Sequence, residues 1–246
     1  MRILIANPNT SASMTEQMVD VAARVAAPDT EIVSCTATRG FEYISSRSEA
    51  QIAGAVVLEA IVEHAERVDA VVIGAYGDPG LVAAKELFDI PIVGMAEAAM
   101  LTACMVAERF SLVTFSANLV PWFIESVNRA GLDPRCASVR TPSAPMGSVH
   151  AVQDALRDVL VAEVDAAVEV DGADAVILAG APLAGLAFDL PNAPGVLIDP
   201  ISSALKQAET LVRVAPRGAA TGRFARPPGK LSAGLDPKLG DWMARR

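Results

Sequence analysis

Short apolar segments alternate with longer segments of helical periodicity along most of the chain. Arg2–Ala6, Ala70–Gly74 and Ala175–Leu178 are short and rich in aliphatic residues, which is typical of strands buried on both faces. Glu49–Arg67 places alanine, valine and leucine at helical spacing, and Ile201–Val214 predicts a further helix. This alternation predicts parallel sheets joined by right-handed helical crossovers.

An internal repeat relates the two halves of the chain. Val68–Ala75 matches Ala173–Gly180 residue by residue, and Ile3–Asn9 similarly corresponds to Phe110–Ser116. The repeat predicts an α/β fold of two pseudo-symmetric lobes, each a parallel sheet flanked by helices.

The expected lobes are residues 1–95 with 200–246, and residues 96–199. Ligands of open α/β sheets bind beyond the carboxyl ends of the strands. Because both lobes are expected to turn those ends toward each other, we predict a ligand cleft between them.

Composition and charge exclude several classes of function. Hydrophobic residues make up 52% of the 246 residues and charged residues 20%, so the chain can bury a sizeable core. The net charge of −9, without a basic face, argues against a nucleic-acid partner. The sequence has no run of about 18 apolar residues, the length that would predict a membrane helix. The apolar run at its start is too short for a signal peptide.

Cysteines and histidines are few and widely separated. Cys35, Cys104 and Cys136 show no CxxC spacing, so we expect reduced thiols in a cytoplasmic protein, with Cys104 buried in a helix. His64 and His150 do not make an ordinary zinc site without carboxylates, and no P-loop or GxGxxG motif is present. We therefore expect neither a metal nor another cofactor.

Four polar or glycine-rich turns follow predicted strands and supply the candidate binding residues. Backbone N–H groups, amides and hydroxyls in such turns can hold an anion or a carbonyl oxygen, and small residues let a ligand approach the backbone. The expected substrate contacts are Asn9, Thr10, Ser11, Ala75, Tyr76, Thr114, Phe115, Ser116, Gly180 and Ala181.

These turns also have structural alternatives. Thr10 or Ser11 can cap the helix that begins near Ala12, which is a common use of such residues. Asp78 can cap the helix that follows it, and Tyr76 can simply pack. Sequence alone leaves both sets of roles open.

Three motifs together resemble hydantoin and allantoin racemases, a branch of the aspartate/glutamate racemase superfamily. They are Asn-Pro-Asn-Thr-Ser (7–11), Gly-Asp-Pro-Gly-Leu (77–81) and Asp-Ile-Pro-Ile-Val-Gly-Met-Ala-Glu-Ala-Ala (89–99). The resemblance spans nearly the whole chain. It implies an isomerase that inverts a stereocentre beside a carbonyl group, in which one cysteine thiolate removes the α-proton and a second thiol returns a proton to the opposite face.

Other residues occupy the two cysteine positions that the resemblance implies. Ala75 stands at the first and Gly180 at the second, and Pro182 also removes a backbone donor from the second turn. We therefore expect any proton transfer to use other groups. The catalytic candidates are Tyr76, Asp78 and His150.

Three hypotheses follow. The first is a small-molecule enzyme acting beside a carbonyl or carboxylate without a cysteine pair, as an isomerase or a diverged lyase or hydrolase, and the retained polar turns favour it. The alternative is a non-catalytic protein that binds a small ligand on a racemase scaffold. The third is deliberate replacement of both cysteines, but glycine near a proline is an unusual choice for that, so we favour natural divergence. We also expect a symmetric homo-oligomer.

Overall fold

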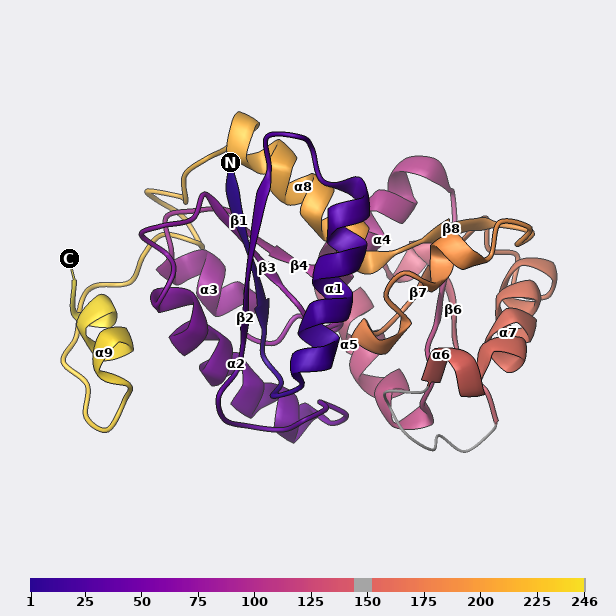
Figure 1. Ribbon diagram of the computed structural model, residues 1–246, viewed down its shortest axis with the longest axis horizontal. Coiled ribbons are helices and arrows are strands. Elements are labelled where there is room, and N and C mark those ends of the chain that lie inside the picture. Colours follow the sequence, from indigo (N-terminus) through magenta and orange to yellow (C-terminus); the bar gives the residue numbers. More distant parts are fainter. Residues whose placement is uncertain (144–151, 246) are drawn as a thin grey trace.

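Two four-stranded parallel sheets with the same strand order form the framework of the molecule (Figure 1). The computed structural model describes residues 1–143 and 152–245. The sheet orders are β2-β1-β3-β4 and β6-β5-β7-β8. The strands are β1 (Arg2–Asn7), β2 (Glu31–Thr36), β3 (Ala70–Ile73), β4 (Ile92–Gly94), β5 (Phe110–Val113), β6 (Cys136–Arg140), β7 (Ala175–Leu178) and β8 (Val196–Ile198). The predicted two-lobed α/β fold is confirmed, and the two copies of the repeat fall on equivalent strands.

Helices flank both sheets (Figure 1). They are α1 (Ala12–Val25), α2 (Arg47–Val62), α3 (Leu81–Leu87), α4 (Met95–Val106), α5 (Val120–Ala130), α6 (Val152–Ala155), α7 (Arg157–Glu169), α8 (Pro200–Val214) and α9 (Pro237–Ala244). After β8 the chain returns to the first lobe, because α8 packs on α1 and β3. Helix α4 contacts both α8 and β7, so it is shared by the two lobes. The lobe boundary expected between residues 95 and 96 therefore stays a prediction.

Strands β1, β3 and β4 of the first sheet are buried on both faces because they are apolar at successive positions, whereas the edge strand β2 is partly exposed. Ile3 and Ile5 of β1 belong to the core under α1 and α8, whereas Leu4 and Ala6 belong to the core under α2 and α3. All four side chains are fully buried. This two-sided burial fixes the carboxyl end of β1, from which the first polar turn emerges.

Two helix boundaries differ from those expected. The helix predicted over Glu49–Arg67 begins at Arg47, because Ser46 and Glu49 form a reciprocal capping box, and it ends at Val62. The sequence also predicts one long helix over Ser148–Glu169, whereas the described part of this range forms two helices, α6 and α7, separated at Leu156. Its first residues, together with His150, lie outside the described residues.

The segment from Ala215 onward combines several Gly and Pro residues with Leu231, Leu235, Leu239 and Trp242, and this pattern predicts an irregular segment docked on the surface. It does dock, but through a helix, α9, at the outer edge of the first lobe (Figure 1). The Trp242 indole N–H donates to the Leu87 carbonyl oxygen over 3.2 Å, and its ring packs 5.4 Å from that of Phe88. Leu239 is also buried, whereas Leu231 is 96% exposed and takes no part.

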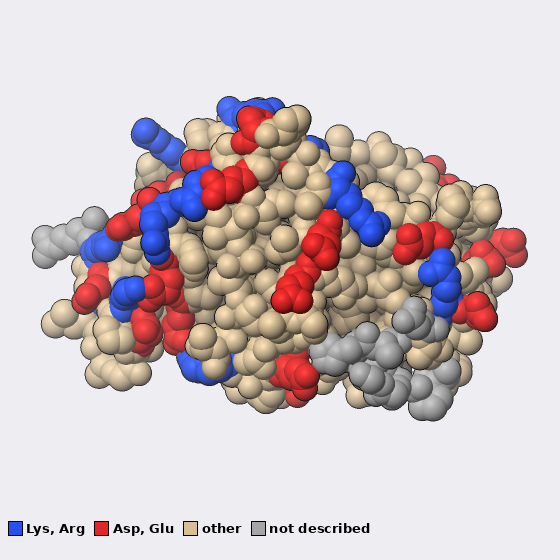
Figure 2. Space-filling view, in the orientation of Figure 1, with Lys and Arg blue, Asp and Glu red and all other residues tan. Residues whose placement is uncertain are grey.

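Charged side chains of both signs are interspersed over the face shown in Figure 2, without a continuous basic patch. None of the helices in the described ranges has the length and apolar character needed to cross a membrane.

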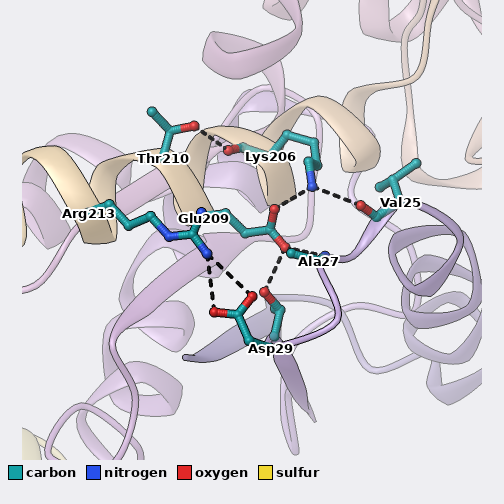
Figure 3. A network of polar contacts seen from close by, with 8 residues as sticks. Val25, Ala27, Asp29, Lys206, Glu209, Thr210 and Arg213 are labelled. Atoms are coloured by element: carbon teal, nitrogen blue, oxygen red, sulfur yellow. Dashed lines mark hydrogen bonds and ion pairs between the residues drawn. The ribbon is translucent and has the colours of Figure 1, made fainter.

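A buried carboxylate attaches α8 to the first lobe (Figure 3). Glu209 accepts hydrogen bonds from the Ala27 N–H (2.8 Å) and the Thr30 hydroxyl (2.7 Å), and it pairs with Lys206 at 2.5 Å. The Lys206 ammonium also donates to the Val25 carbonyl oxygen at the end of α1. Burial alone would raise the pKa of Glu209, but these hydrogen bonds and the Lys206 charge together lower it. Glu209 is therefore a fixed, ionised anchor.

We expect Glu209→Ala to lower the free energy of unfolding by about 2–4 kcal/mol, because two donors lose their acceptor and Lys206 loses its ion-pair partner. Urea denaturation measures this change. Arg213→Ala on the same helix is the control, since it removes an exposed ion pair with Asp29 and should cost less than about 1 kcal/mol. Similar losses in both variants would show that Glu209 is not the anchor.

Candidate functional site

A small cavity lies where the turn after β3 meets the turn after β7. Its volume is about 30 Å³, enough for on the order of one or two water molecules. Ala75 and Gly180, at equivalent positions of the repeat, both line it. The other lining residues are Asn9, Met14, Tyr43, Ile44, Tyr76, Phe115, Leu119, Trp122, Phe123, Ala181 and Pro182. The cavity thus lies between the lobes, at the carboxyl ends of their central strands.

A larger groove of about 390 Å³ borders the same turn between α2 and α5. Its rim carries the exposed ion pair of Arg47 and Glu125. Within the described ranges, five buried side-chain polar atoms lack a hydrogen-bond partner, and none of them lines this groove. Two of them, the hydroxyls of Tyr43 and Tyr76, belong to residues that line the smaller cavity, which is therefore the better candidate site.

The turn after β1 presents an asparagine to the cavity. Asn7 donates to the Asn9 side-chain oxygen (2.9 Å) and to the Thr15 hydroxyl (2.9 Å), and the Ser11 N–H donates to the same Asn9 oxygen. The Asn9 side-chain oxygen thus accepts two hydrogen bonds, whereas its side-chain nitrogen makes a hydrogen bond only to the Met14 sulfur, at 3.5 Å, among the described residues. Sulfur is a weak acceptor, so this N–H group is free to bind a better one.

The phenol of Tyr76 forms part of the cavity wall. The side chain is almost fully buried, its ring packs 4.7 Å from that of Phe123, and its hydroxyl has no partner. Burial, followed by the charge of Asp78 and then Cys136, raises the pKa of Tyr76 well above its ordinary value. The hydroxyl is therefore a neutral donor at physiological pH.

Asp78 caps a helix, although not the one expected from sequence. Its carboxylate accepts hydrogen bonds from the backbone N–H groups of Ala96 (2.9 Å) and Glu97 (2.8 Å), at the start of α4 rather than α3. The residue has a positive φ of 52° and packs so closely on Gly94 that a Cβ there would lie 2.3 Å from its carboxyl carbon. Asp78 does not line the cavity. It positions the turn that bears Tyr76.

Gly180 faces the aromatic ring of Phe115. Its φ is +134°, and a Cβ added there would lie 2.6 Å from Phe115 Cε1. A side chain at this position is opposed both by the backbone conformation and by the ring. The ring of Phe115, from the turn after β5, therefore fills the space beside Gly180.

The turn after β7 is held by two glutamines. Gln17 of α1 donates to the carbonyl oxygens of Pro182 (3.4 Å) and Ala184 (3.0 Å), and Gln153 of α6 donates to the same two oxygens at 2.9 Å each. Since α1 belongs to the first lobe, Gln17 joins the two lobes directly at the cavity.

The structure brings together six of the predicted binding residues. Asn9, Ala75, Tyr76, Phe115, Gly180 and Ala181 line the cavity. Four other predicted residues do not line it. Thr10 donates its N–H to the Phe41 carbonyl oxygen, and Ser11 caps α1. Thr114 is fully buried with an unpartnered hydroxyl, and Ser116 is half-buried beside the short 3-10 helix at 117–119. Ser11 therefore caps a helix, which is the structural role that the sequence offers as an alternative to ligand binding.

Sequence reasoning missed Tyr43, Trp122 and Phe123 as cavity residues. They come from the loop before α2 and from α5, and no motif marks them. An aromatic residue in a loop that follows a strand is the signal that could have identified Tyr43.

The cysteines lie away from the cavity and are half-buried, Cys104 included, where full burial was expected. Burial raises the pKa of Cys35 and of Cys136 to about 11, so both are thiols rather than thiolates at neutral pH. No group of three metal-binding side chains occurs within residues 1–143 and 152–245.

Known proteins share this fold and sequence. The chain matches the family model described as Asp/Glu/Hydantoin racemase over residues 3–208. A hydantoin racemase of Paenarthrobacter aurescens is 38% identical over 86% of this chain and 91% of its own, and one of Rhizobium meliloti is 31% identical over 95% and 98%. The solved structure of an allantoin racemase from Klebsiella pneumoniae has a TM-score of 0.91 and 34% identity, covering 98% of this chain and 99% of that one.

Two repeated lobes with a cavity at their shared strand ends define an α/β protein of the racemase type. The chain belongs to the Asp/Glu/hydantoin racemase family.

We expect Gly180→Ala to lower the free energy of unfolding by about 2–4 kcal/mol, because the added methyl group meets Phe115 on a strained backbone. Gly40→Ala is the matched control: its φ is +114°, but nothing lies within 4 Å, so only the backbone cost of about 1–2 kcal/mol applies. Adding Phe115→Leu to Gly180→Ala should recover part of the loss. No recovery in a urea titration of the double variant would argue against the steric conflict.

Asp78 should leave a signature in the pH dependence of stability. Burial raises its pKa from 3.8 to about 7, against the opposing hydrogen bonds from Ala96 and Glu97. Because the folded state holds the proton to higher pH than the unfolded state, this contribution is fully present below about pH 4 and is lost as the pH rises through about 7.

We therefore expect the free energy of unfolding to fall more steeply between pH 4 and pH 7 in the native chain than in Asp78→Asn, as followed by denaturant titration at each pH. Asp241→Asn, at an exposed position, controls for the loss of one negative charge. Parallel curves for the native chain and Asp78→Asn would contradict the assignment.

Proposed function

We propose that the chain is an enzyme of the hydantoin-racemase type that acts beside the carbonyl group of a small molecule without a pair of thiols. The observation that carries the proposal is the buried, unpartnered Tyr76 hydroxyl in the wall of the cavity that Ala75 also lines. The names of the related hydantoin and allantoin racemases support a hydantoin-like ring as the substrate.

The described lining favours a neutral substrate over a carboxylate. Its polar side chains are Asn9, Tyr43 and Tyr76, and none of the described lining residues is a lysine, arginine or histidine. Burying an anion without a cation is costly, whereas neutral donors suit the carbonyl oxygens of a cyclic amide. The sequence predicts a carbonyl or a carboxylate compound as the substrate, and the lining favours the carbonyl compound.

The proposed reaction is removal of the proton on the carbon beside a ring carbonyl. A base takes the proton, the electron pair of the broken C–H bond forms a carbon–carbon double bond, and the π pair of the carbonyl group moves onto its oxygen to give the enolate. Tyr76 donates a hydrogen bond to that oxygen, where the negative charge develops. Return of a proton to the carbon completes the exchange, and return to the opposite face inverts the centre.

This reaction needs a base to remove the proton. Neither Asp78, whose oxygens are held by α4, nor any thiol reaches the described lining. His150, which lies outside the described residues, is the remaining catalytic candidate from the sequence, and imidazole is a common general base. We therefore propose His150 for this role.

A specific observation favours the alternative of a binding protein without turnover. Among the described lining residues, none is an ordinary acid or base at neutral pH, since the only titratable ones are two buried phenols. Such a cavity recognises a carbonyl compound even if it does not react with it.

The native chain should exchange the α-proton of 5-benzylhydantoin for deuterium in heavy water, as followed by proton NMR with optical rotation. Tyr76→Phe should slow exchange by about 10²-fold or more, the usual effect of losing an oxyanion donor. Thiol alkylation should leave the rate nearly unchanged, because no cysteine lines the cavity.

Loss of activity on alkylation, or an unaltered rate in Tyr76→Phe, would refute this mechanism. Binding without exchange would select the alternative. His150→Gln separates the base from the oxyanion donor, since it should abolish exchange while preserving ligand binding.

A further inference from the structure

Trp122 of α5 stands between the cavity and the groove that lies between α2 and α5. Within residues 1–143 and 152–245 it is the one residue that lines both spaces. The turn after β3 also runs from one space to the other, because Ala75 and Tyr76 line the cavity and Gly77 lines the groove. The indole of Trp122 is therefore the partition between two neighbouring spaces.

The indole lies against this turn because position 77 is glycine. Gly77 has a φ of +100°, and a Cβ there would collide with the Trp122 ring. The indole also packs on Phe123, with ring centroids 5.8 Å apart. Both contacts are apolar, and neither ties the ring to one orientation through a hydrogen bond.

The two spaces differ greatly in volume. The cavity, at about 30 Å³, does not hold a five-membered ring with two carbonyl groups, since small-molecule pockets measure about 300–1,000 Å³. The groove, at about 390 Å³, lies within that range. The room for a substituted ring beside Tyr76 is therefore on the groove side of Trp122.

The equivalent place in the second half of the repeat is closed. Helices α1 and α6 meet there at the turn after β7, where Gln17 and Gln153 donate to the same two carbonyl oxygens of that turn. At the groove, the corresponding helices α5 and α2 are joined by the exposed ion pair of Arg47 and Glu125. Exposed ion pairs contribute little to stability, so the groove is the side of the site that is more open to a ligand.

The lining of the groove is mostly small or apolar. Besides Trp122, its apolar members are Ala50, Gly54, Ala55, Leu58, Pro79 and Ala83. Of the charged lining residues, Arg47 and Glu125 neutralise each other, and the Asp78 carboxylate is held by α4. Such a surface suits an apolar group, and an aromatic ring buries a large apolar area in a space of this size.

We propose that Trp122 is the specificity-determining residue of the site: its indole turns aside for the substituent on the ring carbon beside the carbonyl group, and an aromatic substituent then lies in the groove. This inference rests on the proposed function, because it concerns the same ring in the same cavity. It adds the class of substituent that the ring carries.

The test compares the Kd of 5-benzylhydantoin with that of 5-methylhydantoin, measured by titration calorimetry, a readout that does not depend on the base. The native chain should bind the benzyl compound more tightly. Ala83→Phe adds a ring to the groove from an exposed position on α3, so it should raise the ratio of the benzyl Kd to the methyl Kd about tenfold or more. Val82→Phe is the matched control, since Val82 is exposed on the same helix but does not line the groove, and it should keep the native ratio.

Trp122→Leu tests the partition itself. A shorter apolar side chain removes the cost of displacing and reordering the indole, so the same ratio should fall roughly two- to tenfold. The result for Ala83→Phe does not depend on whether Trp122→Leu folds, because Ala83 is exposed.

An unchanged Kd ratio in Ala83→Phe, or an equal rise in Val82→Phe, would overturn the role of the groove and leave the proposed function standing. An unchanged or higher ratio in folded Trp122→Leu would overturn the role of Trp122, and so would tighter binding of the methyl than of the benzyl compound by the native chain. Absence of binding of both compounds by the native chain would reject the proposed function itself, and this inference with it.

Discussion

The hydrogen bonds from the first N–H groups of α4 to the Asp78 carboxylate determine where the site lies. Helix α4 packs against α8 of the first lobe and β7 of the second, so a turn fixed to its N-terminus is fixed relative to both lobes. The same contact sets the backbone of the turn that carries Ala75 and Tyr76. It requires glycine at position 94, because any side chain there would collide with the carboxyl group.

The cavity combines apolar walls with neutral donors rather than with charges. Phe115, Trp122 and Phe123 supply apolar walls, while Tyr43 and Tyr76 present hydroxyls without a hydrogen-bond partner among the described residues. In a water-poor setting, such donors stabilise a developing oxyanion strongly because no solvent competes. The chain carries a formal net charge of −9, which does not oppose entry of the neutral ligand that we propose.

The sequence predicts the fold well because the buried strands are continuous apolar runs and the repeat relates them. It also predicts a helix cap at Thr10 or Ser11, of which Ser11 makes it, because a cap depends on neighbours in sequence. It fails for Asp78, whose partners on α4 are 18 and 19 residues away, and for Tyr43, which reaches the site from an irregular loop. It fails again for α9, where Asp236 caps a short helix that depends on the pocket for Trp242. Local patterns are visible in sequence, whereas contacts made by tertiary packing are not.

The packing of Phe115 against Gly180 also constrains how this lineage can change. A larger residue at position 180 is harmful while the phenylalanine ring is in place, and a smaller residue at position 115 leaves a void until position 180 is filled. Neither first step is neutral, so the two positions form an epistatic pair. A side chain at position 180 is therefore compatible with this packing only when position 115 changes with it.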